Sequence, residues 1–135
     1  MQTFCKVAPL VAGGALAAYM AFTAVSDKPV KKSWVAPAVA SAGFLGYSIL
    51  TVVKEGPMGF WIDHTRDLWG VQIWMDLLLS VAVGWTLMMP RAKKVDMNLP
   101  FWGVLTLLTG NIGFLGALAR LLFLEENAKP YTPVN

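Results

Sequence analysis

Three side chains that lipid cannot satisfy lie inside two long apolar stretches of the sequence. Asp76 lies a few residues into the stretch that begins near Gly70, and Asn111 and Arg120 lie near the middle and the end of the stretch that begins at Leu99. A charged side chain at the centre of a membrane helix costs at least ~2.5–3.5 kcal/mol on insertion scales. These residues therefore need protein partners, and they are the first candidates for chemistry.

Asp76 and Arg120 are predicted to form a structural ion pair. If 70–89 and 99–124 are antiparallel helices rising ~1.5 Å per residue, both side chains lie at a similar depth below the same membrane surface. Two interpretations of such a pair are open: a proton or ion relay, and a salt bridge that fixes the register of the two helices. One carboxylate per chain, at a shallow depth, favours the salt bridge.

Asn111 and His64 are the candidates for contact with a cofactor. Asn111, at the predicted middle of the membrane, suits an interhelical hydrogen bond worth ~0.6 kcal/mol on average, or contact with a pigment or an isoprenoid. His64 is the single histidine, which excludes a haem with two histidine ligands or a multi-histidine zinc site within one chain. One imidazole nitrogen is enough to ligate the magnesium of a chlorophyll. The alternative, which the sequence favours, is a solvated loop histidine beside Asp63 and Asp67.

The remaining residue types do not suggest catalysis. Cys5 is the single cysteine, and no nucleophile with a base, no phosphate-binding glycine loop and no metal-ligand cluster can be assembled from the sequence. We therefore expect neither an enzyme nor a metal site.

The composition places these candidates in a membrane protein. Of 135 residues, 56% are hydrophobic and 14% are charged, far from a soluble globular average. Four apolar stretches, at about 7–25, 34–53, 70–89 and 99–124, approach the ~20 residues that cross a hydrocarbon core ~30 Å thick. We expect a single all-α integral membrane domain over 1–135, a four-helix transmembrane bundle of two antiparallel hairpins with an interfacial middle loop.

Small and polar residues indicate how these helices pack and begin. Gly103, Gly110, Gly113 and Ala117 share one face of the last helix, where small residues let a neighbouring backbone approach. The tetrapeptide Gly-Phe-Leu-Gly occurs at 43–46 and again at 113–116, which is compatible with a duplicated hairpin. Asp63 or Thr65 is expected to cap the third helix, and Asn98, followed by Pro100, the fourth.

Basic residues concentrate in the loops 26–33 and 90–98. Lysine and arginine in short loops set the orientation of a membrane protein, so we do not assign the net charge of +3 to nucleic-acid binding. The predicted orientation puts these two loops on the cytoplasmic, stromal or matrix side, and both termini and the middle loop on the other. We expect the first apolar stretch to be retained, because it is longer than a usual signal core and no Ala-x-Ala site closes it.

The segment from Asp67 through Leu124 resembles a small uncharacterised family of plant and bacterial integral membrane proteins. The likeness depends on Asp76 early in one helix, a short basic loop, and Gly110-Asn111 in the last helix. The resemblance implies a helical membrane fold, and it implies no function.

Two functions remain open on the sequence. The first is a noncatalytic accessory subunit of a large membrane complex, with a photosynthetic supercomplex of the thylakoid preferred and a respiratory complex second. It would contact lipids, other subunits and, if a pigment is bound, chlorophyll or carotenoid. The second is a small proton-linked carrier, or a lipid- or isoprenoid-binding protein, that works as a homo-oligomer around Asp76. A mitochondrial or bacterial inner membrane is the alternative location.

Overall fold

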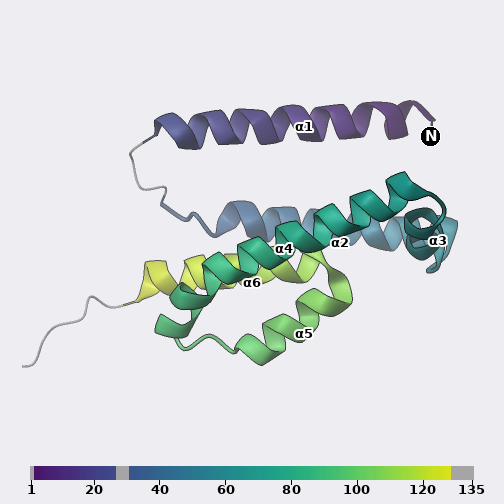
Figure 1. Cartoon of the computed structure of the whole chain (residues 1–135). Helices are drawn as coiled ribbons and strands as arrows, with labels where there is room; N and C mark the ends of the chain where they lie inside the picture. The colour runs from purple at the N-terminus through teal and green to yellow at the C-terminus, as the bar shows by residue number, and fades with distance from the viewer. Residues whose placement is uncertain (1, 27–30, 129–135) are drawn as a thin grey trace, which may run out of the picture. The chain divides into compact units, whose positions relative to one another are not determined.

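The computed structural model describes residues 2–26 and 31–128, and the regular structure in these ranges is helical (Figure 1). The chain separates into two compact units, residues 1–31 and residues 32–135. The first unit contains α1 (Gln2–Val25). The second contains α2 (Val35–Glu55), α3 (Gly59–Thr65), α4 (Leu68–Lys94), α5 (Leu99–Thr109) and α6 (Asn111–Asn127).

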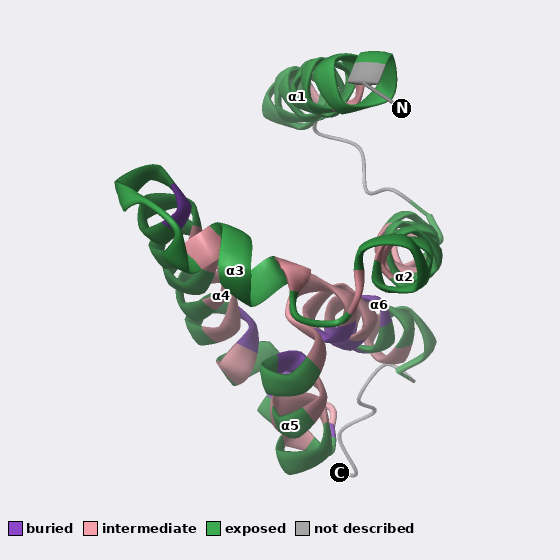
Figure 2. Ribbon diagram, turned by 90° about the vertical axis from the view of Figure 1, so that its right-hand side faces the viewer, coloured by how far each residue is buried: buried purple, intermediate pink, exposed green. Residues whose placement is uncertain are grey.

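Three of these helices, α1, α2 and α4, are long and apolar enough to cross a membrane. Their 21 to 27 residues extend ~32–40 Å at ~1.5 Å per residue, compared with a hydrocarbon core of ~30 Å. Most side chains of α2 and α4 are exposed (Figure 2). The prediction of an all-α chain with membrane-length helices is confirmed.

The last predicted helix, over 99–124, is two helices. α5 ends at Thr109 after 11 residues, and Gly110 follows with φ +61° and ψ −130°. Glycine adopts this backbone conformation readily, whereas other residues seldom do. α6 then begins at Asn111 and packs back against α5 (Figure 1). The prediction of one continuous spanning helix was wrong, because hydropathy counts this glycine as an ordinary membrane residue while its conformation reverses the chain.

The two short helices form a hairpin with its own hydrogen bonds at the turn. At 11 residues, α5 extends ~16 Å, about half of a hydrocarbon core. Gly110 donates its N–H to the Thr106 carbonyl at 2.7 Å, and Gly113 donates its N–H to Thr109 Oγ1 at 2.9 Å. Non-helical backbone at membrane depth is tolerated where protein satisfies it, so this hairpin suits a re-entrant position in a bilayer.

α6 contacts three other helices, α2, α4 and α5. Two of its contacts place an aromatic ring against a glycine. A Cβ added to Gly84 of α4 would lie 2.5 Å from Phe114 Cζ, and a Cβ added to Gly116 would lie 3.2 Å from the Trp102 ring of α5. The buried apolar cluster lies where these helices meet and consists of Met88, Ala92, Met97, Ala117 and Leu121. The core is therefore built around the hairpin, at the C-terminal half of α4.

α2 runs antiparallel to α6. Near the start of α6, Ser41 Oγ donates to the Ile112 carbonyl at 2.8 Å. Near its end, the Trp34 and Phe123 rings meet edge to face with centroids 5.5 Å apart. The N-terminal end of α2 therefore lies beside the C-terminal end of α6.

α4 and α6 run in the same direction. Gly84 faces Phe114 near the start of α6, and Arg91 pairs with Glu125 near its end. The residue numbers of the contacting pairs therefore increase in the same direction along the two helices. The C-terminal end of α6 therefore lies beside the basic loop that follows α4, whereas a single helix over 99–124 would place residue 124 at the far end of α4 from that loop.

The starts of α4 and α5 are capped by side chains, whereas those of α2, α3 and α6 are not. Asn98 Oδ1 accepts the Phe101 N–H at 3.2 Å and Pro100 lies in the first turn, as predicted. The cap of α4 is Asp67, whose carboxylate accepts the Gly70 N–H at 2.8 Å. The predicted caps Asp63 and Thr65 belong instead to α3, a short helix that the sequence analysis did not separate from the loop.

Candidate functional site

Asp76 projects from the outward side of α4. On the same helix, Trp85 lies against Gly103 of α5. Trp85 is nine residues after Asp76, and nine steps of ~100° place the two side chains about 180° apart around the helix. Gln72, Asp76, Leu79, Val83 and Thr86 are all exposed and follow one another at steps of four, three, four and three. This series, here called the Asp76 face, is a continuous stripe along the side of α4 away from α5.

Asp76 has no hydrogen-bond or ion-pair partner in the part of the chain that the structure describes. The ion pairs of that part are those of Arg66 with Asp63 and Asp67, and of Arg91 with Glu125. Asp76 lies eight residues beyond Leu68, where α4 begins, which is ~12 Å along the helix axis. The carboxylate is thus inside the apolar part of the helix and faces away from the described residues 32–128 that pack against α4.

The predicted ion pair between Asp76 and Arg120 does not form. The Arg120 guanidinium lies 5.7 Å from the centroid of the Phe123 ring, and its side chain is exposed. Because α6 runs parallel to α4 and Glu125 pairs with Arg91, Arg120 lies about ten residues, or ~15 Å, beyond the level of Asp76. The prediction assumed an antiparallel last helix, and the reversal at the hairpin removes that assumption.

Asn111 is the first residue of α6 and is half-buried. The polar contacts beside it are made by its neighbours: Ser41 donates to the Ile112 carbonyl, and Thr109 accepts from Gly113. No hydrogen bond of the Asn111 side chain is found among the described residues. The interhelical hydrogen bond predicted for Asn111 is therefore not formed among the described residues, and the one beside it is donated by Ser41.

The small residues of the last predicted helix have different environments. Gly113 is buried, and a Cβ there would lie 2.7 Å from the Leu105 backbone of α5. Ala117 is fully buried, and Gly103 lies beneath the Trp85 ring. Gly110 forms the turn, and no described atom outside its two chain neighbours lies within 4 Å of a Cβ added there. Three of the four predicted packing residues thus lie at helix contacts, and the fourth sets the direction of the chain.

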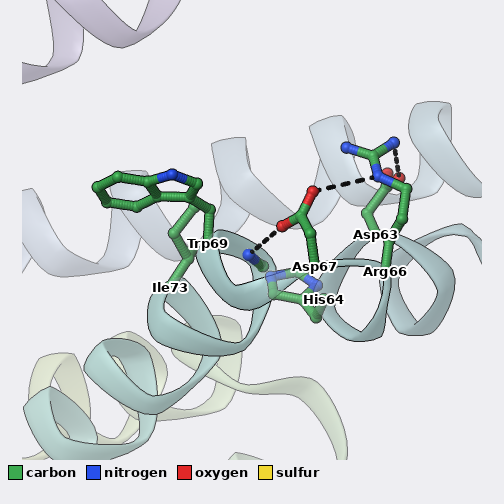
Figure 3. A pocket seen from close by; sticks show the side chains of 7 residues that line it. Asp63, His64, Arg66, Asp67, Trp69 and Ile73 are labelled. Atoms are coloured by element: carbon green, nitrogen blue, oxygen red, sulfur yellow. Dashed lines mark hydrogen bonds and ion pairs between the residues drawn. The ribbon is translucent and has the colours of Figure 1, made fainter.

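His64 lies at the corner between α3 and α4 (Figure 3). The corner is close-packed at the backbone, since a Cβ on Gly70 would lie 2.3 Å from the Asp63 carbonyl oxygen. The Gly70 N–H that Asp67 accepts lowers the pKa of the Asp67 carboxyl from its usual value. Beside it is a shallow hollow of about 220 Å³ lined by Asp63, His64, Arg66, Asp67, Trp69 and Ile73.

The His64 ring is held by its own helix and by aromatic neighbours. Its Nδ1 hydrogen-bonds to the Phe60 carbonyl oxygen, and its centroid lies 5.4 Å from that of Trp74. A carbonyl only accepts hydrogen bonds, so Nδ1 carries the proton and Nε2 keeps its lone pair when the ring is neutral. Metal-ligating histidines commonly hold their second nitrogen in this way. His64 thus has one ring nitrogen, Nε2, without a hydrogen bond among the described residues, whereas Asp63 and Asp67 are both paired with Arg66.

The ion pair of Arg91 with Glu125 was missed by the sequence analysis, which placed the two residues on opposite membrane sides. The signal that indicates otherwise is length. The stretch 99–124 has 26 residues, more than the ~20 that a span requires, and it contains Gly110-Asn111 near its centre. An over-long apolar stretch with a helix-ending residue in its middle is consistent with a hairpin.

Comparisons of the chain with protein-family models, with curated proteins and with solved structures found no match. The resemblance of 67–124 to an uncharacterised membrane family remains a prediction.

Proposed function

We propose that this chain is a noncatalytic subunit of a larger membrane protein assembly. The observation that supports the proposal is Asp76, a carboxylate on the outward side of a lipid-length helix with no partner among the described residues of its unit, 32–128. A charged side chain left against acyl chains costs ~2.5–3.5 kcal/mol at the centre of a membrane helix on insertion scales, and Asp76 lies between that centre and the start of α4. A neighbouring protein that contacts α4 removes this cost.

Several polar groups near the hairpin turn are satisfied within the chain. Ser41, Thr109 and the backbone of Gly110 satisfy one another or the adjacent helix within the chain. Thr106 Oγ1 is buried without a hydrogen-bond partner among the described residues, so the hairpin meets most but not all of its own polar requirements. The charge of Asp76 lies on the opposite side of α4, and it favours a subunit whose Asp76 face is completed by a partner.

The proposed assembly is a photosynthetic supercomplex, with a respiratory complex as the second choice. The feature that favours a pigmented assembly is His64, whose Nδ1 is held by the Phe60 carbonyl, so that Nε2 keeps the lone pair that a magnesium ligand requires. When bound, a chlorophyll would supply light absorption. His64 would hold its magnesium, and Phe60 would fix the ring that holds it.

The proposal is tested by isolating the full-length chain at its natural expression level in a mild detergent. We expect a tagged copy to migrate on native gels with a large assembly, and mass spectrometry to find the same partner subunits in fixed ratio after two different detergents. A discrete homo-oligomer that binds protons and a ligand together would contradict the proposal and support the carrier. The absorption spectrum of the isolated assembly distinguishes a pigmented complex from a respiratory one.

A further inference from the structure

We infer that the Asp76 face binds one transmembrane helix of a partner subunit, and that this helix carries a lysine or arginine at the depth of Asp76. The inference rests on the proposed function and names the chemistry of the partner. It depends on two properties of α4, the spacing of the exposed residues and the charge among them.

The spacing is that of a helix-packing seam. Positions 72, 76, 79, 83 and 86 alternate steps of four and three, which is the 3.5-residue period of two helices packed at a small angle. Leu79 and Val83 are 61% and 60% exposed. Four other positions, Trp74, Leu77, Val81 and Trp85, are half-buried and form the side that faces the rest of the unit. α4 thus has one side that packs against this unit and a second, straight seam that the described residues 32–128 leave exposed.

The charge specifies the occupant. Between Asp76 and Arg91 the sequence of α4 contains no charged residue, so the carboxylate is isolated within the apolar part of the helix. A cation on the facing helix turns an unpaired charge into a pair, and charged residues in membrane segments characteristically pair with one another. Gln72 lies one turn away on the same face, and its amide can satisfy a remaining hydrogen-bond position of the pair.

A second copy of this chain suits the face less well. A two-fold interface through the same face would bring Asp76 against Asp76, and two carboxylates at close range cannot both remain ionised. Lipid alone leaves the charge unpaired. The partner of opposite charge is therefore the occupant to which we commit, and the second copy is an outcome that the experiment can detect.

The first test locates the partner. A photo-crosslinking amino acid is placed at Leu79 or Val83 in the full chain, and as the matched control at Leu78. Leu78 is also exposed but lies about 160° from Asp76 around the helix. We expect crosslinks from Leu79 and Val83 to one partner, in an apolar segment that contains lysine or arginine, and none to that segment from Leu78. A crosslinked segment without a basic residue, or a crosslink to a second copy of this chain, overturns the inference.

The second test separates charge from hydrogen bonding. We expect Asp76→Asn to reduce the amount of copurified partner at least tenfold, Asp76→Glu to keep most of it, and Gln72→Ala to reduce it less than Asp76→Asn does. Exchange of the charges, with Asp76→Lys combined with an acidic residue at the partner's basic position, should restore the complex. Asp76→Leu removes a charge from a lipid-length helix, so its folded yield should equal the wild type, and a lost complex in that variant is not due to unfolding.

The outcomes distinguish the inference from the proposed function. If the wild-type chain copurifies with a large assembly and Asp76→Asn does so equally well, the subunit function stands. The inference that a partner helix carries a basic residue opposite Asp76 is then wrong. If the wild-type chain forms no assembly at all, the proposed function itself is wrong.

Discussion

Arg91 of α4 and Glu125 of α6 form a two-point ion pair, in which Arg91 Nε donates to Glu125 Oε1 at 2.8 Å and Nη2 pairs with Oε2. Both residues lie in the last turns of their helices. The pair can form because α5 and α6 reverse at Gly110, which brings the end of α6 back beside the end of α4 (Figure 1). The pair could not form if residues 99–124 were one continuous helix antiparallel to α4.

Removing this ion pair should cost a small but measurable amount of stability. Its side chains are 48% and 30% exposed, so solvent screens the attraction, and exposed pairs contribute ~0.2–1 kcal/mol. The two-point geometry favours the upper part of that range. We expect Glu125→Gln and Arg91→Gln each to lower the free energy of unfolding in detergent by about 0.5–1 kcal/mol, and the double variant to lose less than the sum. Glu126→Gln is the control, since its amide oxygen can still accept the Lys32 N–H; strictly additive losses at 91 and 125 would show that the pair contributes nothing.

The hairpin makes a prediction about membrane topology. Because α5 is too short to cross and α6 returns beside the end of α4, residues 94 and 127 should face the same side of the membrane. Single cysteines at Lys94 and Asn127, placed in a Cys5→Ser background, should react with an impermeant maleimide from one side, and a cysteine at Met58 from the other. Labelling of 127 together with 58 would instead indicate four complete crossings.

The repeated tetrapeptide supplies a matched pair of glycine variants. Gly113→Ala should lower the free energy of unfolding by ~1–3 kcal/mol, because its Cβ would lie 2.7 Å from the Leu105 backbone and overpacking of this kind forces the backbones apart. Gly43→Ala meets nothing within 4 Å in the described part of the chain, and it should be neutral or stabilising by up to ~1 kcal/mol because alanine is the better helix former. Unfolding in detergent, followed by circular dichroism, measures both. Equal effects of the two variants would mean that the close contact between α5 and α6 is absent.

The cap of α4 should depend on acid. The pKa of Asp67 is lowered from its ordinary value of 3.8, chiefly by the Gly70 N–H that its carboxylate accepts. A lowered pKa in the folded state means that the cap is fully present above the ordinary value and is lost as the pH falls through the lowered one. The Gly70 amide resonance in detergent micelles should therefore shift at acidic pH with a midpoint below 3.8. Asp67→Asn should abolish that titration and Asp63→Asn should keep it; a Gly70 shift that survives in Asp67→Asn would assign it to another group.

His64 gives the pigmented form of the proposal its own test. In an isolated pigmented assembly, His64→Leu should remove one chlorophyll per copy of this chain, because it deletes the nitrogen that would ligate magnesium. His64→Gln, which offers an oxygen in a similar place, should keep part of it. Trp69→Phe, which changes another residue that lines the hollow, serves as the control for general disturbance of the corner. An unchanged pigment content in His64→Leu would assign His64 a purely structural role.

Composition and hydropathy predicted the helical class and the approximate bounds of α1, α2 and α4, because an apolar run of about 20 residues has few other stable forms in lipid. The same evidence predicted Asn98 as a cap, since capping needs only a side-chain oxygen at the right position in the chain. Which charged side chains form ion pairs could not be predicted from composition and hydropathy. Asp76 and Arg120 were matched through an assumed helix direction, and that direction depended on one residue, Gly110.

The sequence alone determined that this chain is apolar, helical and left with one carboxylate in a membrane-length helix, because these properties follow from residue types and local periodicity. Tertiary structure decided which side chains meet. The Gly-Phe-Leu-Gly at 43–46 is exposed on α2. The same tetrapeptide at 113–116 contacts α5, including its Trp102 ring, and α4. The physical reason is that a glycine's φ at one position sets the direction of a whole helix, and this direction fixes the neighbours of every residue that follows.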